Sequence, residues 1–313
     1  MNKDSKIFVT GHKGLVGSAV VRELAKQGYT NILTASRLEC DLLYANEVLA
    51  YFCRKCPIYV INCAGKVGGI HANDIYSADF ISENLRIQTN VIEASHRCGV
   101  KKLIILGSSC IYPKLCPQPI KEEYLLTSEL EETNIGYAIA KIAGLTMCRM
   151  YRKQYGSDFI SAMPTNLYGV NDNFNLESSH VLAALIRKFY EAKVNNLPEV
   201  ELWGTGSPKR EFLFVDDLAE ALIFLMNNYN NSEHINIGVG EDITIKELAR
   251  TIKQVVGFKG DVIWNTTYPD GTPRKLLDVS KINNLGWKAK TSLEEGLNIT
   301  YKWFVDNYKN IKK

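Results

Sequence analysis

A serine and a cysteine stand two residues apart, directly after an apolar run that ends at Leu106. Ser108 and Cys110 belong to the stretch GSSCIYP, and further along Tyr137 and Lys141 stand four residues apart in a helical pattern. Side chains four apart share one face of a helix, so the phenol and the ammonium can reach one site. We expect the ammonium to favour the ionised phenol. Together, a hydroxyl, a phenol and an ammonium predict proton transfer to a carbonyl oxygen.

If the carbonyl is reduced, the reaction needs a hydride donor, and the glycine-rich stretch TGHKGLVG predicts a dinucleotide cofactor. It follows the first apolar run and opens a helical pattern, and its glycines are spaced three residues apart. Such glycines permit a tight turn and let the backbone approach a pyrophosphate at the N-terminus of the helix. The predicted cofactor-binding residues of this loop are Gly11, Lys13, Gly14, Leu15, Val16 and Gly17.

The end of the second predicted strand indicates which nicotinamide cofactor is preferred. Proteins that prefer NAD place an acidic residue there, against the ribose hydroxyls, whereas this chain has Arg37 in the sequence ASR. A guanidinium group suits a 2′-phosphate, which an acidic residue would repel. We therefore expect NADP(H), unless Arg37 is an ordinary solvated loop charge.

Apolar runs alternate with helical patterns through the first half of the chain. Strands are expected over 6–10, 32–35, 58–62, 103–106 and 159–163. Helices are expected over 14–27, 45–54, 84–98 and 137–155. This alternation predicts an α/β fold with a Rossmann-type, doubly wound parallel sheet.

The pattern becomes shorter and richer in loops after Pro164. Helices are expected over 180–192, 217–227, 245–256 and 293–307, and strands over 200–203 and 211–215. We expect 1–165 to form the NADP-binding domain and 166–313 to form mainly a smaller C-terminal α/β substrate domain. Segments from about 210 to 240 are expected to return to the first domain.

Composition excludes several classes of protein. The 313 residues carry 37 basic and 34 acidic side chains spread along the chain, so no field of one sign indicates nucleic-acid binding. The longest stretch without a charge, residues 159–171, is shorter than the roughly 20 apolar residues of a membrane helix. The N-terminus lacks an apolar signal region. We expect a cytoplasmic protein that does not bind membranes.

The eight cysteines are too sparse for a disulfide scaffold. Cys53 and Cys56 form a CxxC motif at the end of a predicted helix. No second such pair is present, and no histidine has the spacing of a zinc ligand. We therefore expect no metal site, and neither a metal nor a redox role for this pair.

With these motifs the chain resembles the extended short-chain dehydrogenase/reductase family, and within it the GDP-L-fucose synthases. The resemblance covers nearly the whole chain. The matching stretches are TGHKGLVG at 10–17, KVGGI at 66–70, GSSCIYP at 107–113, YAIAK at 137–141, PTNLYG at 164–169, SHV at 179–181, WGTG at 203–206 and REF at 210–212.

The resemblance implies roles for the catalytic residues. Tyr137 would protonate the oxygen of a GDP-bound 4-keto sugar as C4 receives hydride from NADPH, with Ser108 on the carbonyl. Lys141 would hold the nicotinamide ribose, and Tyr137 and His180 would also contact the cofactor. Cys110 and His180 would exchange the acidic protons on C3 and C5 before reduction. Taken alone, Cys110 is better explained as a small buried residue, and His180 as an ordinary residue of a first helical turn; their joint occurrence in matching contexts favours the catalytic roles.

Substrate contacts follow from the same resemblance. Arg210 and the first-turn region of the helix around Lys188 would bind the diphosphate, Trp203 would pack near the nucleotide, and Ser108 would hydrogen-bond the sugar carbonyl. Asn166 and Lys209 are further candidates for the GDP end. The alternatives are that Lys209 and Arg210 are ordinary loop charges and that Trp203 belongs to the core. His71 and Lys13 depart from the family pattern.

Other functions stay open at this point. The chain could be a dedicated reductase of another GDP-4-keto sugar, such as a heptose, or a non-catalytic NADP sensor, although a sensor would be expected to lack Tyr137 or Lys141. A dehydratase would place an acidic pair where Ser109 and Cys110 stand. Members of this family commonly pair two helices from each subunit, so a homodimer is expected.

Overall fold

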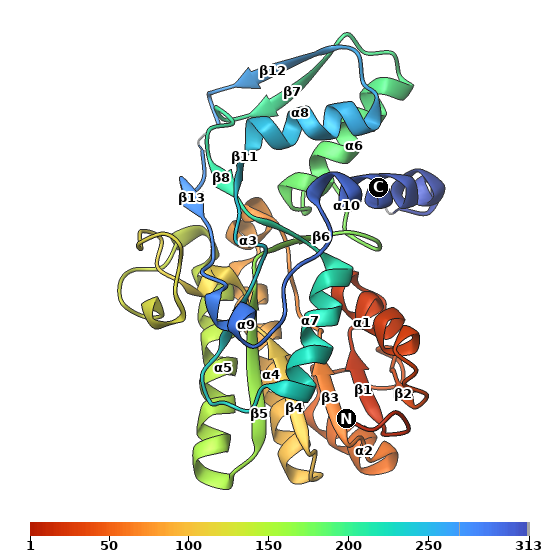
Figure 1. Cartoon of the computed structure of the whole chain (residues 1–313), viewed down its shortest axis with the longest axis vertical. Helices are drawn as coiled ribbons and strands as arrows, with labels where there is room; N and C mark the ends of the chain where they lie inside the picture. Colours follow the sequence, from red (N-terminus) through yellow and green to blue (C-terminus); the bar gives the residue numbers. More distant parts are fainter. Residues whose placement is uncertain (269, 312–313) are drawn as a thin grey trace.

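The computed structural model describes residues 1–268 and 270–311. Its centre is a six-stranded sheet of order β10-β5-β4-β3-β1-β2 in which every pair is parallel (Figure 1). Apolar residues fill these strands because both faces of the sheet are covered. This confirms the predicted Rossmann-type sheet. The strands are β1 (Ile7–Thr10), β2 (Ile32–Leu33), β3 (Tyr59–Asn62), β4 (Lys102–Leu106), β5 (Asp158–Pro164) and β10 (Ile235–Ile237).

Helices cover both faces of this sheet. On one face α1 (Leu15–Lys26) packs against α7 (Val215–Asn228). On the other, α4 (Ser77–Arg97) lies between α2 (Ala45–Lys55) and α5 (Ile135–Tyr155) (Figure 1). Helix α5 ends at Gly156, whose φ of 71° allows the left-handed turn back to β5.

A second, smaller apolar core lies in the upper lobe of Figure 1, around Phe189, Leu248 and Phe304. Helix α8 begins with a capping box between Thr244 and Glu247, a common start signal of helices. The elements of this lobe include α6 (Val181–Val194), α8 (Ile245–Val256), α10 (Leu293–Asn307) and the parallel pair β7 (Glu199–Trp203) and β12 (Asp261–Asn265).

Short strands connect the lobe to the main sheet. The pair β6 (Asn166–Tyr168) and β9 (Phe212–Phe214) is parallel, and β8 (Lys209–Arg210) lies between β11 (Ile243–Thr244) and β13 (Arg274–Lys275). From β9 the chain returns to the main sheet through α7 and β10. The division into domains at residue 165 stays a prediction.

Several elements differ from those expected. Helix α4 begins at Ser77 instead of residue 84, because its first turns bury little besides Phe80 and so lack a long apolar stripe. Strand β2 is shorter than predicted, since it is an edge strand with β1 as its one partner. The helices α3 (Ile70–Ile75) and α9 (Ser280–Asn284) were not predicted, nor were the strands β6, β8, β10, β11, β12 and β13. These elements are short, and the pairing of the strands with distant segments is not visible in a local pattern.

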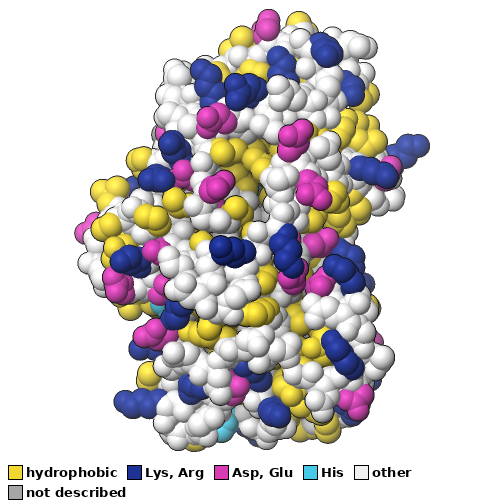
Figure 2. Space-filling model, viewed as in Figure 1, with side chains coloured by type: hydrophobic (Ala, Val, Ile, Leu, Met, Phe, Trp, Pro, Cys, Tyr) yellow, Lys and Arg dark blue, Asp and Glu magenta, His cyan; other side chains and the backbone are white. Residues whose placement is uncertain are grey.

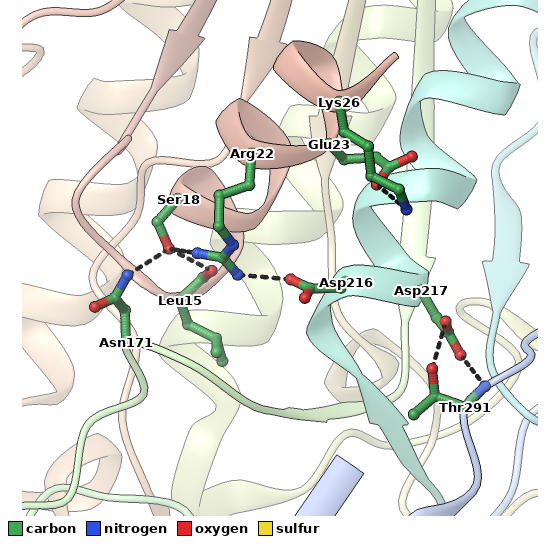
Figure 3. Close-up of polar contacts among 9 residues, drawn as sticks. All are labelled: Leu15, Ser18, Arg22, Glu23, Lys26, Asn171, Asp216, Asp217 and Thr291. Carbon is green, nitrogen blue, oxygen red and sulfur yellow. Dashed lines mark hydrogen bonds and ion pairs between the residues drawn. The ribbon is translucent and has the colours of Figure 1, made fainter. Parts of the chain in front are cut away.

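Polar contacts tie the glycine-loop helix α1 to distant segments (Figure 3). Arg22 donates to Asp216 of α7 at 2.6 Å, and Asn171, from the loop after β6, donates to the Ser18 hydroxyl at 2.9 Å. Asp217, also on α7, accepts from the backbone and the hydroxyl of Thr291 at 2.8 and 2.9 Å. These contacts place the loop after β6 beside the start of α1.

The buried carboxylate of Glu211 joins three segments. It is fully shielded from solvent and accepts from the backbone N–H groups of Val239, Gly240 and Leu277 at 2.6, 2.7 and 3.1 Å. Burial outweighs these hydrogen bonds and raises the pKa of Glu211. Glu211 therefore fixes the strand that carries Arg210 against the turn after β10 and the segment that follows β13.

The face drawn in Figure 2 carries basic and acidic side chains interspersed, with no single-sign field on it. In the part of the chain that the structure describes, every helix is too short or too polar to cross a membrane.

We expect Glu211→Ala to lower the free energy of unfolding by about 3–5 kcal/mol, because the N–H groups of Val239, Gly240 and the buried Leu277 would lose their shared acceptor. Urea denaturation followed by circular dichroism measures this. The exposed acid Glu241, changed to alanine, is the control and should shift the value by less than about 0.5 kcal/mol. Equal effects of the two substitutions would contradict this role of Glu211.

Candidate active site

A cleft of about 1600 Å³ opens between the carboxyl ends of the main strands and the upper lobe, and all predicted site residues line it. This is where open parallel sheets bind ligands. Its size is suited to two nucleotide-sized molecules bound together, since ligand pockets of drug-sized molecules span about 300–1,000 Å³. The structure thus brings the predicted residues together, while their individual roles stay predictions.

Tyr137 and Lys141 lie on the first two turns of α5 and face the cleft. The Lys141 Nζ donates to the Leu106 carbonyl oxygen at 2.9 Å and lies 5.6 Å from the centre of the Tyr137 ring. Burial lowers the pKa of Lys141 to about 8. This lysine therefore stands beside the phenol but is hydrogen-bonded to the end of β4.

The expected ionisation of Tyr137 is wrong for this state of the protein. Burial raises the pKa of Tyr137, the nearby Cys110 raises it further, and a hydrogen bond with Ser108 acts in the opposite direction. The desolvation of the phenol outweighs any influence of Lys141. Tyr137 is therefore protonated near neutral pH and can act as a proton donor.

The GSSCIYP turn after β4 is anchored on both sides of Cys110. A Cβ atom on Gly107 would lie 2.1 Å from the Met163 sulfur, so glycine is required where the turn crosses β5. The Ser108 hydroxyl accepts from the Cys110 N–H at 3.3 Å. Beyond Cys110, the Tyr112 hydroxyl bonds Asn236 of β10 at 2.5 Å and His234 at 3.0 Å. The serine and the thiol are thus held at the carboxyl edge of the sheet.

His180 reaches the cleft from the opposite side, as the N-cap residue of α6. The loop before it is fixed to the first half of the chain, because the Gly69 N–H donates to the Ser178 carbonyl at 2.9 Å. Burial within the cleft, and secondly the charge of Lys275, lower the pKa of His180. His180 is consequently neutral near pH 7.

Lys275 is a site residue that sequence reasoning missed. Its Nζ lies 3.7 Å from the Cys110 sulfur, and its charge acts on His180. The parallel pairing of β13 with β8 sets Lys275 opposite Arg210. No local pattern signals this lysine, since its position depends on the register of two strands of two residues each.

The glycine loop has the shape of a phosphate cradle. Gly11 has a φ of 64°, and a Cβ atom on Gly17 would lie 2.2 Å from the Gly11 oxygen, so both positions require glycine. The residues at the start of α1 line the cleft, and the N-terminus of a helix is suited to bind an anion such as a phosphate. The turn that carries Arg37 is closed by Glu39, which accepts from the N–H and hydroxyl of Ser36 at 2.8 and 2.9 Å. An exposed guanidinium at the cleft rim fits a dinucleotide with a 2′-phosphate.

The far end of the cleft presents an aromatic surface. Trp203 is 57% exposed and stacks on Tyr268, with ring centres 4.3 Å apart. Lys188 lies over the Trp203 ring at 5.2 Å and donates to the Glu201 carbonyl at 3.1 Å. We expected Lys188 in the first-turn region of its helix, but it lies in the middle of α6.

Arg210 is a second cation of the cleft. Burial lowers the pKa of its guanidinium, which stays a cation beside Asp270.

The side-chain amide of Asn166 donates a hydrogen bond to the backbone carbonyl oxygen of Glu211 at 2.9 Å. Asn166, in β6, also lines the cleft.

Among residues 1–268 and 270–311, no three His, Cys, Asp or Glu side chains are grouped so as to hold a metal ion.

Residues 7–238 match the model of the NAD dependent epimerase/dehydratase family. The chain belongs to this family. It is 60% identical over 307 residues to the putative GDP-L-fucose synthase 2 of Arabidopsis thaliana, covering 98% of this chain and 94% of that protein. The resemblance stated from the motifs is thereby confirmed.

Two solved structures are similar in fold and sequence. A GDP-6-OMe-4-keto-L-xylo-heptose reductase from C. jejuni superposes with a TM-score of 0.94 at 40% identity, over 98% of this chain and 99% of that one. A GDP-L-fucose synthetase from Naegleria fowleri, bound to NADP, gives 0.93 at 32% identity, over 100% and 96%. The proteins similar to this chain thus include a GDP-L-fucose synthetase and a GDP-heptose reductase, the two enzymes considered from the sequence.

Proposed function

We propose that this chain is an NADPH-dependent enzyme that epimerises C3 and C5 of a GDP-4-keto-6-deoxy sugar and reduces C4, as a GDP-L-fucose synthase. The observation that carries the proposal is the meeting of two proton-transfer groups in one cleft. Ser108, Tyr137 and Lys141 form one group, and Cys110 and His180 form the other. The similarity to GDP-L-fucose synthases along nearly the whole chain supports the same conclusion.

Reduction uses the group at the end of β4. NADPH, when bound along the glycine loop, supplies the hydride for C4. Ser108 and Tyr137 donate hydrogen bonds to the C4 oxygen, and the protonated phenol of Tyr137 gives its proton to that oxygen. Lys141, fixed to the Leu106 carbonyl, places its cation beside the phenol as negative charge develops there.

Epimerisation uses the same carbonyl. Protons on C3 and C5 are acidified by the C4 ketone, and the enolate that forms accepts hydrogen bonds from Ser108 and Tyr137. One of Cys110 and His180 acts as the base that removes each proton from one face of the ring, and the other acts as the acid that delivers a proton to the opposite face. The Lys275 ammonium lies 3.7 Å from the Cys110 sulfur, where it can attract the negative charge that develops on that sulfur during proton transfer. We assign Lys275 this supporting role.

The remaining contacts suit the GDP part of the substrate. Arg210 and Lys188 supply cations for the diphosphate, and the half-exposed Trp203 offers an aromatic surface against which the base can pack. Asn166 and Ser108 lie nearer the sugar. Lys188 binds as a point charge, since an ammonium lacks the bidentate fork of arginine.

A homodimer in the cytoplasm completes the proposal. Helix α5 leaves apolar side chains exposed, with Ile139, Met150 and Tyr155 between 41% and 53% accessible. Such side chains suit the pairing of α4 and α5 with the same helices of a second copy.

A dedicated heptose C4 reductase is the second candidate, favoured by the similarity to the C. jejuni enzyme. Such an enzyme would reduce C4 without exchanging protons at its neighbours. The two candidates therefore differ in whether solvent hydrogen enters the sugar.

We expect incubation with NADPH and GDP-4-keto-6-deoxymannose in deuterated water to give GDP-L-fucose labelled at C3 and C5. NMR and mass spectrometry of the product measure the label. The Cys110→Ser variant should still oxidise NADPH but lose exchange by at least about 100-fold, because general acid–base groups contribute about 10²–10⁴-fold. Reduction without label in the wild-type enzyme, or turnover only with a heptose substrate, would favour the second candidate.

We expect Arg37→Ala to weaken NADPH binding about 10–100-fold, because hydrogen bonds to a charged group contribute about 1.5–3 kcal/mol. NADH binding should change little, since NADH lacks the 2′-phosphate. Fluorescence titration gives both dissociation constants. Arg54, an exposed arginine on α2, provides the control variant Arg54→Ala. Equal losses for NADPH and NADH, or wild-type protein that binds the two equally, would contradict the role of Arg37.

A further inference from the structure

Three thiols gather where helices α2 and α4 end. Cys53 is on the last turn of α2, Cys56 is its C-cap residue, and Cys98 is the C-cap residue of α4. The sulfur atoms of Cys53 and Cys98 are 3.5 Å apart, and the Cys56 thiol donates to the Cys53 carbonyl at 3.1 Å. The sequence showed the CxxC pair alone. The packing of α2 on α4 adds the third thiol from 45 residues away.

This cluster is remote from the cleft. Cys56 precedes β3 and Cys98 precedes β4, so the cluster lies at the amino ends of these strands. The glycine loop and Ser108 follow the carboxyl ends of β1 and β4, at the opposite edge of the sheet. The proposed reaction therefore gives these thiols no task.

Cys53 and Cys98 stand out because their sulfur atoms are in contact with each other. Cys53 and Cys56 are also exposed, whereas Cys98 is half-buried like Cys63, Cys110 and Cys116, and Cys40 and Cys148 are buried. Once an oxidant removes two electrons and two protons, a disulfide would bring these sulfur atoms from 3.5 Å to about 2.05 Å. Burial and the adjacent Cys53 raise the pKa of Cys98 to about 11. Cys53, which is the more exposed partner, is thus the thiol that meets an oxidant first.

We propose that Cys53 and Cys98 form an oxidisable dithiol, which closes to a disulfide on reaction with a low-molecular-weight disulfide such as oxidised glutathione. Closure joins the end of α2 to the end of α4. This reverses the expectation from the sequence that the CxxC motif has no redox role, and it assigns the partner of Cys53 as Cys98 and not Cys56.

The exchange proceeds in two balanced steps. The Cys53 thiolate attacks one sulfur of oxidised glutathione, forming a mixed disulfide and releasing one reduced glutathione. The Cys98 thiolate then attacks the Cys53 sulfur and releases the second. The protein loses two thiol protons and two electrons, and the glutathione disulfide is reduced to two thiols. Cys98 is weakly ionised, but because its sulfur is already in contact with that of Cys53, the second step takes place between two groups held side by side.

The test is peptide mapping of the folded, full-length protein after treatment with excess oxidised glutathione, without reduction. We expect a peptide pair joined through Cys53 and Cys98. The disulfide should also raise the melting temperature by about 3–8 °C, because it closes a long loop in the unfolded chain. Adding dithiothreitol should reverse both effects.

Serine variants separate the roles of the three thiols. Cys56→Ser should keep the Cys53–Cys98 link, whereas Cys98→Ser should stop at glutathione attached to Cys53, with no rise in melting temperature. A Cys53–Cys56 link as the main product would overturn the proposal. So would wild-type protein that carries glutathione on Cys53 but forms no link to Cys98, or that does not react at Cys53.

Discussion

The turn after β4 is the constraint on which the site depends. It has to leave the sheet, expose a hydroxyl and a thiol two residues apart, and stay rigid. Glycine at 107 is required because the Met163 sulfur fills the space of a side chain. Ile111 is fully buried, and Tyr112 is bonded to Asn236 of β10. The edge strand β10 thus holds the proposed catalytic turn, and the chain returns to the sheet to form it after α6 and β7 and before α8, β12 and α10 of the lobe.

Desolvation controls the charges within the cleft. Burial is the largest cause of the pKa changes of three site residues: it raises the pKa of Tyr137, and it lowers that of Lys141 to about 8 and that of His180. A protonated phenol and a neutral imidazole result near pH 7. This state suits a reductase, in which the phenol must give up a proton. The cations that remain, Arg210 and Lys275, lie where an anionic substrate and a thiolate would need them.

The sequence predicted what local patterns encode. The glycine loop, the strand ends and the Tyr137–Lys141 pair depend on spacings within one turn or one helix, and the structure places them in one cleft. Glu211, Lys275 and Cys98 could not be predicted, because each acts through a partner in a distant segment. Lys275 reaches Cys110 only through the pairing of β13 with β8. The ionisation of Tyr137 was predicted wrongly, since a neighbouring lysine in the sequence says nothing about the burial of the phenol.

The central claim is that one cleft holds separate groups for reduction and for proton exchange. The most direct test follows Tyr137→Phe in deuterated water with substrate and NADPH, recording NADPH oxidation and label in the sugar together. The account predicts that the rate of reduction falls by about 10²–10⁴-fold. Because Cys110, His180 and Ser108 are intact, the fold-loss in the rate of exchange should be smaller by a factor of about ten or more. A parallel loss of both activities, or unchanged NADPH oxidation, would contradict it.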